Sequence, residues 1–186
     1  AAVSEVPPFG LVVVKRSLKA LSDVASWNRH RRPVRVIGIT GSYGKTTTRE
    51  MVAAALSHRL NIHSSPENYN NHFGVPLTLL GLRPGHDAVV VELGASGENE
   101  IRSLCEIAKP EIGIITGIGR AHVERFGSHK ALIRAKGELA EAIPGRGVLI
   151  VPADDPHCEQ LVSRASCRVV RVSSRLVSSR LDASPE

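Results

Sequence analysis

The sequence predicts an α/β domain of the phosphate-loop type, with a mostly parallel sheet and helices on both faces. Apolar runs rich in β-branched residues alternate along the chain with segments of helical periodicity. A glycine-rich segment, residues 38–48, directly follows one of these runs and opens a helical pattern. The length of 186 residues corresponds to about one domain. Strands that alternate with helices imply right-handed crossovers and therefore a parallel sheet.

The first half of the chain supplies the strand, glycine loop and helix that define this class. Residues 1–14 look irregular, and apolar residues at helical spacing over 18–25 predict a short lead-in helix. After a basic cluster and a proline, residues 34–40 predict a buried strand. Apolar residues at 52–56 mark one face of the helix that follows the glycines.

The second half repeats the alternation of strands and helices. Predicted strands lie at 88–93, 112–116 and 148–151, and predicted helices at 98–108, 129–142 and 156–164. Residues 173–186 are rich in serine and weakly patterned, so they are a frayed end or the start of a further region.

Composition excludes several functional classes. Lys and Arg number 24 and Asp and Glu 18, which gives a net charge of +6, but aromatic residues make up only 3%. Nucleic-acid binding usually needs aromatic stacking platforms, so we expect no nucleic acid and favour an anionic small substrate. The apolar runs are four or five residues long, too short for a membrane span. The three cysteines lack CxxC spacing, and we expect a cytoplasmic protein.

The glycine-rich segment predicts a phosphate-binding loop. Glycines allow consecutive backbone N–H groups to face a phosphate, and the start of the helix adds partial positive charge. A lysine and a threonine follow, which suit a phosphate and Mg²⁺ respectively. Strict spacing would place glycine at Ile39, so the loop is a variant, and a glycine-rich turn before an ordinary helix is the alternative. The candidate nucleotide-binding residues are Gly41, Ser42, Tyr43, Gly44, Lys45, Thr46 and Thr47.

Three further positions draw attention because of where they stand along the chain. Glu92 ends a predicted strand, where a carboxylate would face the phosphate loop and hold a metal; it could equally cap the next helix. His122 follows the strand at 112–116, and Lys136 lies in a predicted helix. By chemistry alone, these two are an ordinary loop histidine and a solvated lysine.

Amide side chains gather in the segment 66–76, before an apolar stretch. Asn70 and Asn71 could bind a polar substrate without adding charge. The alternative is an asparagine-rich turn that caps the next helix.

Taken together, these segments resemble the central ATP-binding domain of the Mur ligases, amide ligases that build peptidoglycan precursors. The resemblance covers residues 11–165 and is specific because the motifs occur in a fixed order. Its carriers are Thr40–Thr47, Asn68–Thr78, Glu92–Ala95, Ala121–Ser128 and Ala135–Leu139. Within the family, these runs are most similar to the members that add D-alanyl-D-alanine to UDP-MurNAc-tripeptide.

The resemblance implies a role for each candidate residue. Lys45 and the loop amides would hold the β- and γ-phosphates of ATP. Thr46 and Glu92 would bind one Mg²⁺, and His122 a second. Lys136 would be catalytic together with Lys45 and His122, and in several family members the matching lysine carries a carbamate. Asn70 and Asn71 would lie near the incoming substrate.

The implied reaction is ATP-driven amide formation through an acyl phosphate, with UDP-MurNAc-tripeptide and D-alanyl-D-alanine as substrates. The implied organisation makes residues 1–33 a lead-in segment and helix left from an N-terminal domain. Residues 34–172 form the ATP-binding central domain, and 173–186 a tail or the start of a missing region. We expect a monomer that lacks ligase turnover without its other domains.

Two alternatives remain at this point. A related ligase, such as a folylpolyglutamate, polyglutamate or cyanophycin synthetase, has a similar phosphate loop, although the segment 70–76 argues against it. The other is a non-catalytic subunit that kept the fold. Joint retention of five residues argues against such decay: Lys45, Thr46, Glu92, His122 and Lys136.

Overall fold

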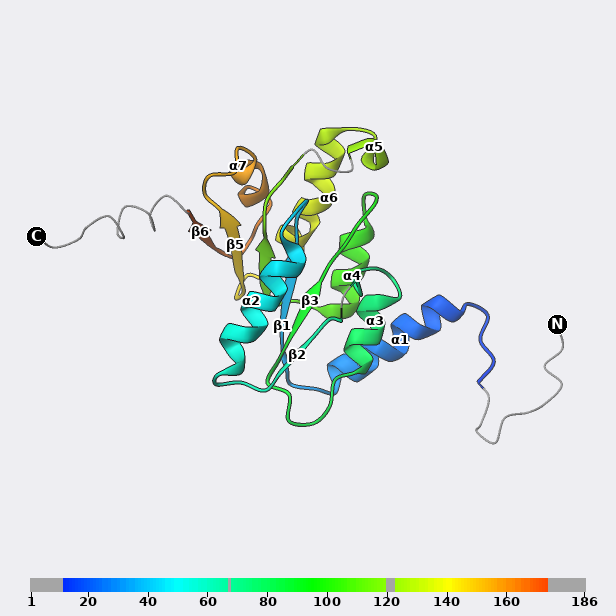
Figure 1. The fold of residues 1–186 in the computed structure, drawn as a ribbon. Helices are drawn as coiled ribbons and strands as arrows, with labels where there is room; N and C mark the ends of the chain where they lie inside the picture. Colours follow the sequence, from blue (N-terminus) through cyan, green and yellow to red (C-terminus); the bar gives the residue numbers. More distant parts are fainter. Residues whose placement is uncertain (1–11, 67, 120–122, 174–186) are drawn as a thin grey trace, which may run out of the picture.

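The protein is described by a computed structural model that covers residues 12–66, 68–119 and 123–173. These residues form a six-stranded sheet in the order β2-β3-β1-β4-β5-β6, in which every pair of neighbours is parallel (Figure 1). The strands are β1 Arg35–Thr40, β2 Ile62–Ser64, β3 Ala88–Glu92, β4 Ile112–Ile115, β5 Val148–Pro152 and β6 Arg168–Val172.

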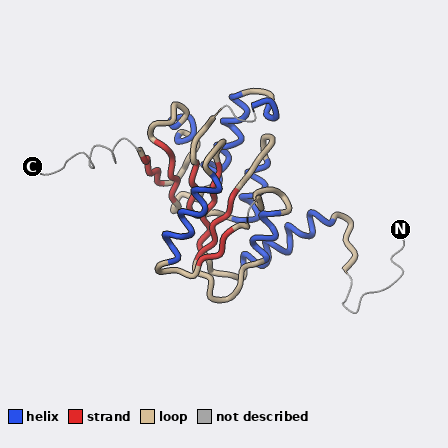
Figure 2. Tube along the Cα trace, in the orientation of Figure 1, coloured by secondary structure: helices blue, strands red, loops and turns tan. Residues whose placement is uncertain are grey.

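The helices cover the two faces of the sheet unequally, as Figure 2 shows by colour. The helix α2 packs on β1, β2 and β3 over a small apolar cluster, whereas α4 and α6 pack on the other face over most of the core. The helix α1 packs against α3 and α4. The helices are α1 Ser17–His30, α2 Lys45–Ser57, α3 Gly74–Leu80, α4 Glu100–Ala108, α5 Val123–Phe126, α6 His129–Ala142 and α7 Cys158–Val162.

The strand β1 lies at the centre of the sheet and sets the position of the site. It pairs with β3 on one side and β4 on the other, so the direction of winding changes at β1. In open parallel sheets, ligands bind beyond the carboxyl ends of the strands at such a switch point. The phosphate loop predicted from the sequence leaves β1 at this end.

The predicted fold class is confirmed, and most predicted elements are present. The predicted helix 129–142 has these bounds in the structure, whereas α4 and α7 are shorter than predicted. The strands β2 and β6 and the short helix α5 were not predicted. The three residues of β2 are only half-buried, and β6 is an edge strand with two arginines, so neither has the pattern of a buried strand. No helix among the described residues combines the length and apolarity needed to cross a bilayer.

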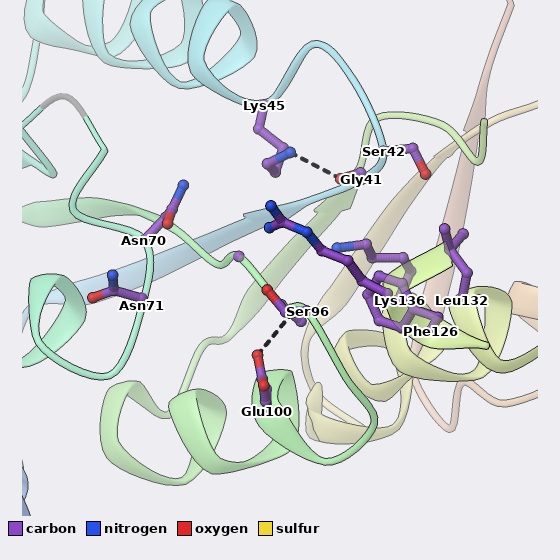
Figure 3. A pocket seen from close by; sticks show the side chains of 13 residues that line it. Gly41, Ser42, Lys45, Asn70, Asn71, Ser96, Glu100, Phe126, Leu132 and Lys136 are labelled. Carbon is purple, nitrogen blue, oxygen red and sulfur yellow. Dashed lines mark hydrogen bonds between the residues drawn. The ribbon is translucent and has the colours of Figure 1, made fainter. Parts of the chain in front are cut away.

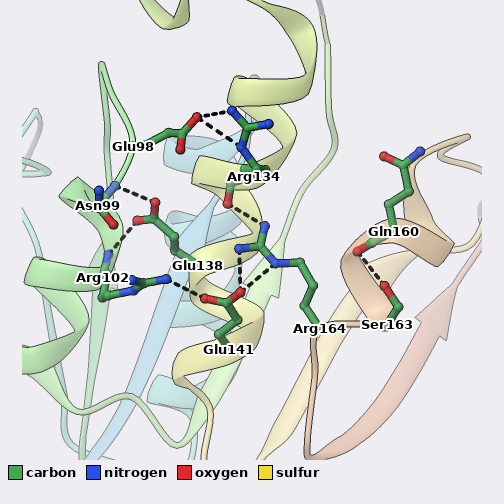
Figure 4. A network of polar contacts seen from close by, with 9 residues as sticks. All are labelled: Glu98, Asn99, Arg102, Arg134, Glu138, Glu141, Gln160, Ser163 and Arg164. Carbon is green, nitrogen blue, oxygen red and sulfur yellow. Dashed lines mark hydrogen bonds and ion pairs between the residues drawn. The ribbon is translucent and has the colours of Figure 1, made fainter.

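A polar network joins α4, α6 and the segment after α7 (Figure 4). The buried carboxylate of Glu138 accepts hydrogen bonds from the backbone N–H groups of Asn99 and Arg102, at the start of α4. Glu141 accepts from the guanidinium groups of Arg102 and Arg164, at 2.8 Å and 2.6 Å. Because α6 carries both glutamates, this network fixes the helix that also holds Lys136.

Candidate active site

The phosphate loop connects β1 to α2 and ends at Gly44, the residue before the helix. Gly44 has a φ of 73°, a left-handed conformation that glycine adopts without strain. Lys45 Nζ donates to the carbonyl oxygen of Gly41 at 3.0 Å. The buried hydroxyl of Ser42 has no hydrogen-bond partner among the described residues. The loop therefore combines a cation, a buried hydroxyl without a partner among the described residues, and the start of a helix.

Of the candidates in this segment, Gly41, Ser42 and Lys45 line the cavity described below. Gly44, Thr46, Tyr43 and Thr47 do not line it. The ring of Tyr43 packs against Gly117 and Gly119, in the loop that leaves β4. Thr47 is exposed on α2. Their predicted role in nucleotide binding stays a prediction.

Glu92 ends β3 and is only 2% exposed. Its Oε2 accepts a hydrogen bond from the Thr46 hydroxyl at 2.9 Å, and its Oε1 accepts one from Asn70 Nδ2 at 3.0 Å. The structure thus brings together three segments: the first turn of α2, the end of β3 and the segment that leads into α3. This last segment, residues 65–66 and 68–73, is called the asparagine loop below. A carboxylate beside a threonine hydroxyl offers two oxygen ligands, the type that Mg²⁺ prefers.

The two asparagines differ in their contacts. Asn70 reaches Glu92, whereas Asn71 Oδ1 accepts from the backbone N–H groups of Phe73 and Gly74, both at 3.0 Å. Asn71 therefore forms the turn that leads into α3, as the alternative interpretation expected. Both asparagines also line the cavity.

Lys136 is 4% exposed, so it is not the solvated lysine that the local sequence suggests. Burial, together with the nearby ammonium group of Lys45, lowers the pKa of Lys136 to about 8, while Glu100 and Glu138 oppose this shift. Its Nζ lies 5.6 Å from the ring centroid of Phe126. At neutral pH, a larger fraction of Lys136 is therefore in the neutral amine form than of an exposed lysine.

Lys45, Lys136 and the two asparagines line one cavity of about 260 Å³ (Figure 3), and Glu92 is bonded to one of its lining residues, Asn70. Lys45 approaches it from α2 and Lys136 from α6, while Asn70 and Asn71 lie on the loop before α3. The lining residues are Gly41, Ser42, Lys45, Asn70, Asn71, Gly94, Ala95, Ser96, Glu100, Arg125, Phe126, Leu132 and Lys136. Three of these side chains are basic and one is acidic, which suits an anionic ligand.

His122 lies outside the described residues, so its predicted role as a metal ligand stays a prediction. Among the residues that are described, no group of three or more His, Cys, Asp or Glu side chains is placed to hold a metal ion. Thr46 and Glu92 are a smaller set. A set of this size is usual where Mg²⁺ takes its other ligands from nucleotide phosphates and water.

Sequence reasoning missed Arg49, a buried arginine on α2. Its guanidinium donates to the carbonyl oxygens of Ser65 at 2.7 Å and Pro66 at 3.0 Å, and so ties the asparagine loop to the phosphate-loop helix. An arginine beside a glutamate in a helix looks solvated, and no local signal would have revealed its burial. Arg125 and Phe126 were also missed as lining residues, although they stand inside one of the quoted motifs.

The sequence from residue 39 to residue 182 matches the family model of the Mur ligase middle domain. The chain belongs to the Mur ligase family.

Within the Mur ligases, the chain is similar to bacterial enzymes with one specificity. A Synechocystis protein named UDP-N-acetylmuramoyl-tripeptide–D-alanyl-D-alanine ligase is 42% identical over 161 residues, which are 83% of this chain and 36% of that protein. The structure of MurF from Acinetobacter baumannii has a TM-score of 0.83 at 36% identity, over 86% of this chain and 36% of that one. The chain spans about a third of the length of these relatives.

Two further structures contain ADP. MurF from Thermotoga maritima in complex with ADP has a TM-score of 0.82 at 28% identity, over 91% of this chain and 39% of that one. Folylpolyglutamate synthase from Mycobacterium tuberculosis, complexed with ADP, has a TM-score of 0.66 at 16% identity, over 83% and 45%. At that identity the second likeness concerns the fold alone.

Proposed function

We propose that this chain is the ATP-binding domain of a MurF-type ligase, which joins D-alanyl-D-alanine to UDP-MurNAc-tripeptide through an acyl phosphate. The observation that carries the proposal is one cavity lined by Lys45, Lys136 and Asn70, the last of which donates to the carboxylate of the Glu92–Thr46 pair. The names of the similar proteins supply the two substrates. The proposal places ATP in the phosphate loop and Mg²⁺ at Thr46 and Glu92.

The residues of the loop fit a triphosphate. The Ser42 hydroxyl, which has no partner among the described residues, can donate to a phosphate oxygen. Lys45 can give up its hydrogen bond to the Gly41 carbonyl and form an ion pair with a phosphate instead. Thr46 and Glu92 fit Mg²⁺ because they provide two adjacent oxygen donors at the edge of this loop. Bound Mg²⁺ would neutralise charge on the phosphate oxygens. His122 stays a proposed ligand of a second Mg²⁺.

The proposed reaction begins when a carboxylate of UDP-MurNAc-tripeptide attacks the γ-phosphorus of ATP and ADP leaves. Lys45 would stabilise the charge that builds on the transferring phosphoryl group, the usual source of most catalysis in such transfers. Asn70 and Asn71 would orient the acid, because their amides face the cavity without adding charge. The amine of D-alanyl-D-alanine then attacks the acyl carbon, and phosphate leaves from the tetrahedral intermediate.

Lys136 would act from the opposite wall of the cavity. With a pKa near 8, it holds a substantial neutral fraction just above neutral pH, and a neutral amine is the form that reacts with CO₂. The resulting carbamate would replace a cation with an anion beside the proposed metal site. This change would convert the basic wall of the cavity into one that supports Mg²⁺.

The other parts of the proposal concern setting and partners. We propose a monomer in the cytoplasm, where ATP is available and where reducing conditions suit the three free cysteines. Residues 34–172 would be the nucleotide-binding unit, with the preceding and following segments leading to other domains. A synthetase for polyglutamate chains stays the second candidate, since its fold is shared, but the asparagine loop and the identities favour the MurF type.

Ligase turnover by the whole natural protein tests the proposal. ATP, Mg²⁺ and UDP-MurNAc-tripeptide are incubated with D-alanyl-D-alanine or, in parallel, with the tripeptide replaced by a folate and the dipeptide by glutamate. Release of phosphate and formation of the pentapeptide precursor are followed by coupled assay and mass spectrometry. We expect product only with D-alanyl-D-alanine. Product only in the folate arm would establish the second candidate, and no turnover with either pair would favour a non-catalytic subunit.

A further inference from the structure

Asp155 stands in the turn between β5 and α7, and both of its carboxylate oxygens accept hydrogen bonds from backbone groups. Oδ1 accepts from the N–H of His157 at 2.8 Å, a bond within its own turn. Oδ2 accepts from the N–H of Ile118 at 2.6 Å, 37 residues away along the chain. Asp155 therefore connects the segments that leave two neighbouring strands, β5 and β4, at their carboxyl ends.

The segment bonded to Asp155, residues 116–119, is also hydrogen-bonded to the phosphate loop. The carbonyl oxygen of Gly117, next to Ile118, accepts from the N–H of Ser42 at 2.8 Å. The hydroxyl of Thr116 donates to the carbonyl oxygen of Tyr43. A continuous path of hydrogen bonds and one peptide unit thus leads from the carboxylate of Asp155 to the middle of the phosphate loop.

Packing reinforces this path at Gly117. Its φ of 152° is a conformation that other residues rarely adopt, and a Cβ placed there would lie 2.4 Å from the hydroxyl oxygen of Tyr43. The side chain of Ile118 is buried in the core, whereas the glycines at 117 and 119 have no side chain to pack. The backbone of this segment is also held by hydrogen bonds, and among the described residues the only charged partner is Asp155.

From this geometry we propose that Asp155 is a positioning residue for nucleotide binding. It fixes the segment 116–119 against the phosphate loop, and so holds the backbone N–H of Ser42 and its neighbours in the arrangement that receives phosphates. Asp155 is not among the residues that line the cavity. The inference rests on the proposed binding of ATP at this loop. The competing explanation is that Asp155 serves only the turn into α7, through His157 and its own backbone.

The preceding residue offers a matched control. Asp154 is exposed and its carboxylate accepts a hydrogen bond from the hydroxyl of Ser173 at 2.7 Å, away from the phosphate loop. Asp154→Ala and Asp155→Ala remove the same group from adjacent positions. A general loss of charge would affect both variants, whereas loss of the Asp155 contacts affects only the second. Hydrogen exchange then separates the two roles of Asp155, because a disturbed β5–α7 turn quickens exchange near His157 and loss of the path quickens it at Ser42.

The experiment measures Mg²⁺-ADP binding by calorimetry and backbone hydrogen exchange in the whole natural protein. We expect Asp155→Ala to weaken ADP binding by about tenfold or more, and Asp154→Ala to leave it unchanged. Without nucleotide, exchange should quicken at the amides of Ile118 and Ser42 in Asp155→Ala. In turnover, KM for ATP should rise while kcat at saturating ATP is kept. If the alanine variant fails to fold, Asp155→Asn, which keeps one acceptor oxygen, should give intermediate effects in both measurements.

Three results would overturn the inference. One is unchanged ADP affinity, another is faster exchange confined to residues 155–162, and the third is weaker ADP binding with normal exchange at Ser42. The exchange measurement needs no nucleotide. If the wild-type protein binds no ADP, the proposed function fails, and exchange at Ser42 still decides whether Asp155 fixes the loop.

Discussion

Replacing Lys136 with methionine should stabilise the fold while it removes the proposed catalytic group. Lys136 is 4% exposed, and its pKa lies near 8 instead of its ordinary value of 10.5. The difference between 10.5 and about 8, at about 1.4 kcal/mol for each pKa unit, corresponds to about 3–4 kcal/mol of destabilisation by the charged form. Methionine fills a similar volume without a charge, so Lys136→Met should recover up to about this free energy at pH 7.

The stability difference between the variant and the wild-type protein should depend on pH in a defined direction. Below pH 8, Lys136 is protonated in both the folded and the unfolded state, so the full cost of burying the charge is present. Between about pH 8 and 10.5, the unfolded chain binds the proton more tightly than the folded one, and wild-type stability rises relative to the variant. The advantage of Lys136→Met should therefore be largest below pH 8 and disappear towards pH 10.5.

Urea unfolding followed by circular dichroism measures this difference, in buffers freed of CO₂ so that no carbamate forms. Lys130→Met, at an exposed position on the same helix, is the matched control and should change stability by less than about 0.5 kcal/mol at pH 7. The reasoning is refuted if Lys136→Met is less stable than wild type at pH 7. It is also refuted if the difference between the two proteins stays constant from pH 7 to pH 10.

Three further predictions follow from the same site. With ¹³C-bicarbonate, wild-type protein should give a carbamate resonance that Lys136→Met lacks, and identical spectra would contradict the proposal. In the presence of Mg²⁺, Glu92→Gln should weaken ADP binding at least about tenfold, because mutating even a residue that only hydrogen-bonds to a metal ligand lowers metal affinity roughly 10–100-fold. An equal loss of ADP affinity in EDTA would argue against a metal role for Glu92. Gly74→Ala places a Cβ 2.3 Å from the Cα of Tyr69, and should cost about 1–3 kcal/mol in urea unfolding. Gly145→Ala, whose Cβ would meet nothing closer than 3.6 Å, should cost less, and equal costs would refute the clash.

The positions of the phosphate loop and Glu92 could be predicted from local sequence because they depend on the topology of the sheet. A strand, a glycine loop and a helix in succession specify where the loop lies, and parallel strands bring their carboxyl ends to one edge. This reasoning placed Glu92 opposite the phosphate loop, and in the structure its carboxylate accepts a hydrogen bond from Thr46. The role of the pair as Mg²⁺ ligands stays a prediction.

The wall of the site opposite the phosphate loop could not be derived in the same way. Lys136 stands among charged residues in a helix, and its burial comes from the packing of α6 with elements distant in the sequence. Family resemblance identified this lysine, but local periodicity did not. Asp155 and Arg49 act through backbone groups far along the chain, and such contacts leave no local signature in the sequence.

The most direct test of the account is the affinity of the whole natural protein for Mg²⁺-ADP in Lys45→Ala compared with Lys130→Ala. Lys45 faces the cavity from the first turn of α2, whereas Lys130 is exposed on α6. We predict that calorimetry will find ADP binding weakened at least about tenfold, or about 1.4 kcal/mol, in Lys45→Ala alone. Equal affinity in the two variants would contradict a phosphate site in this loop.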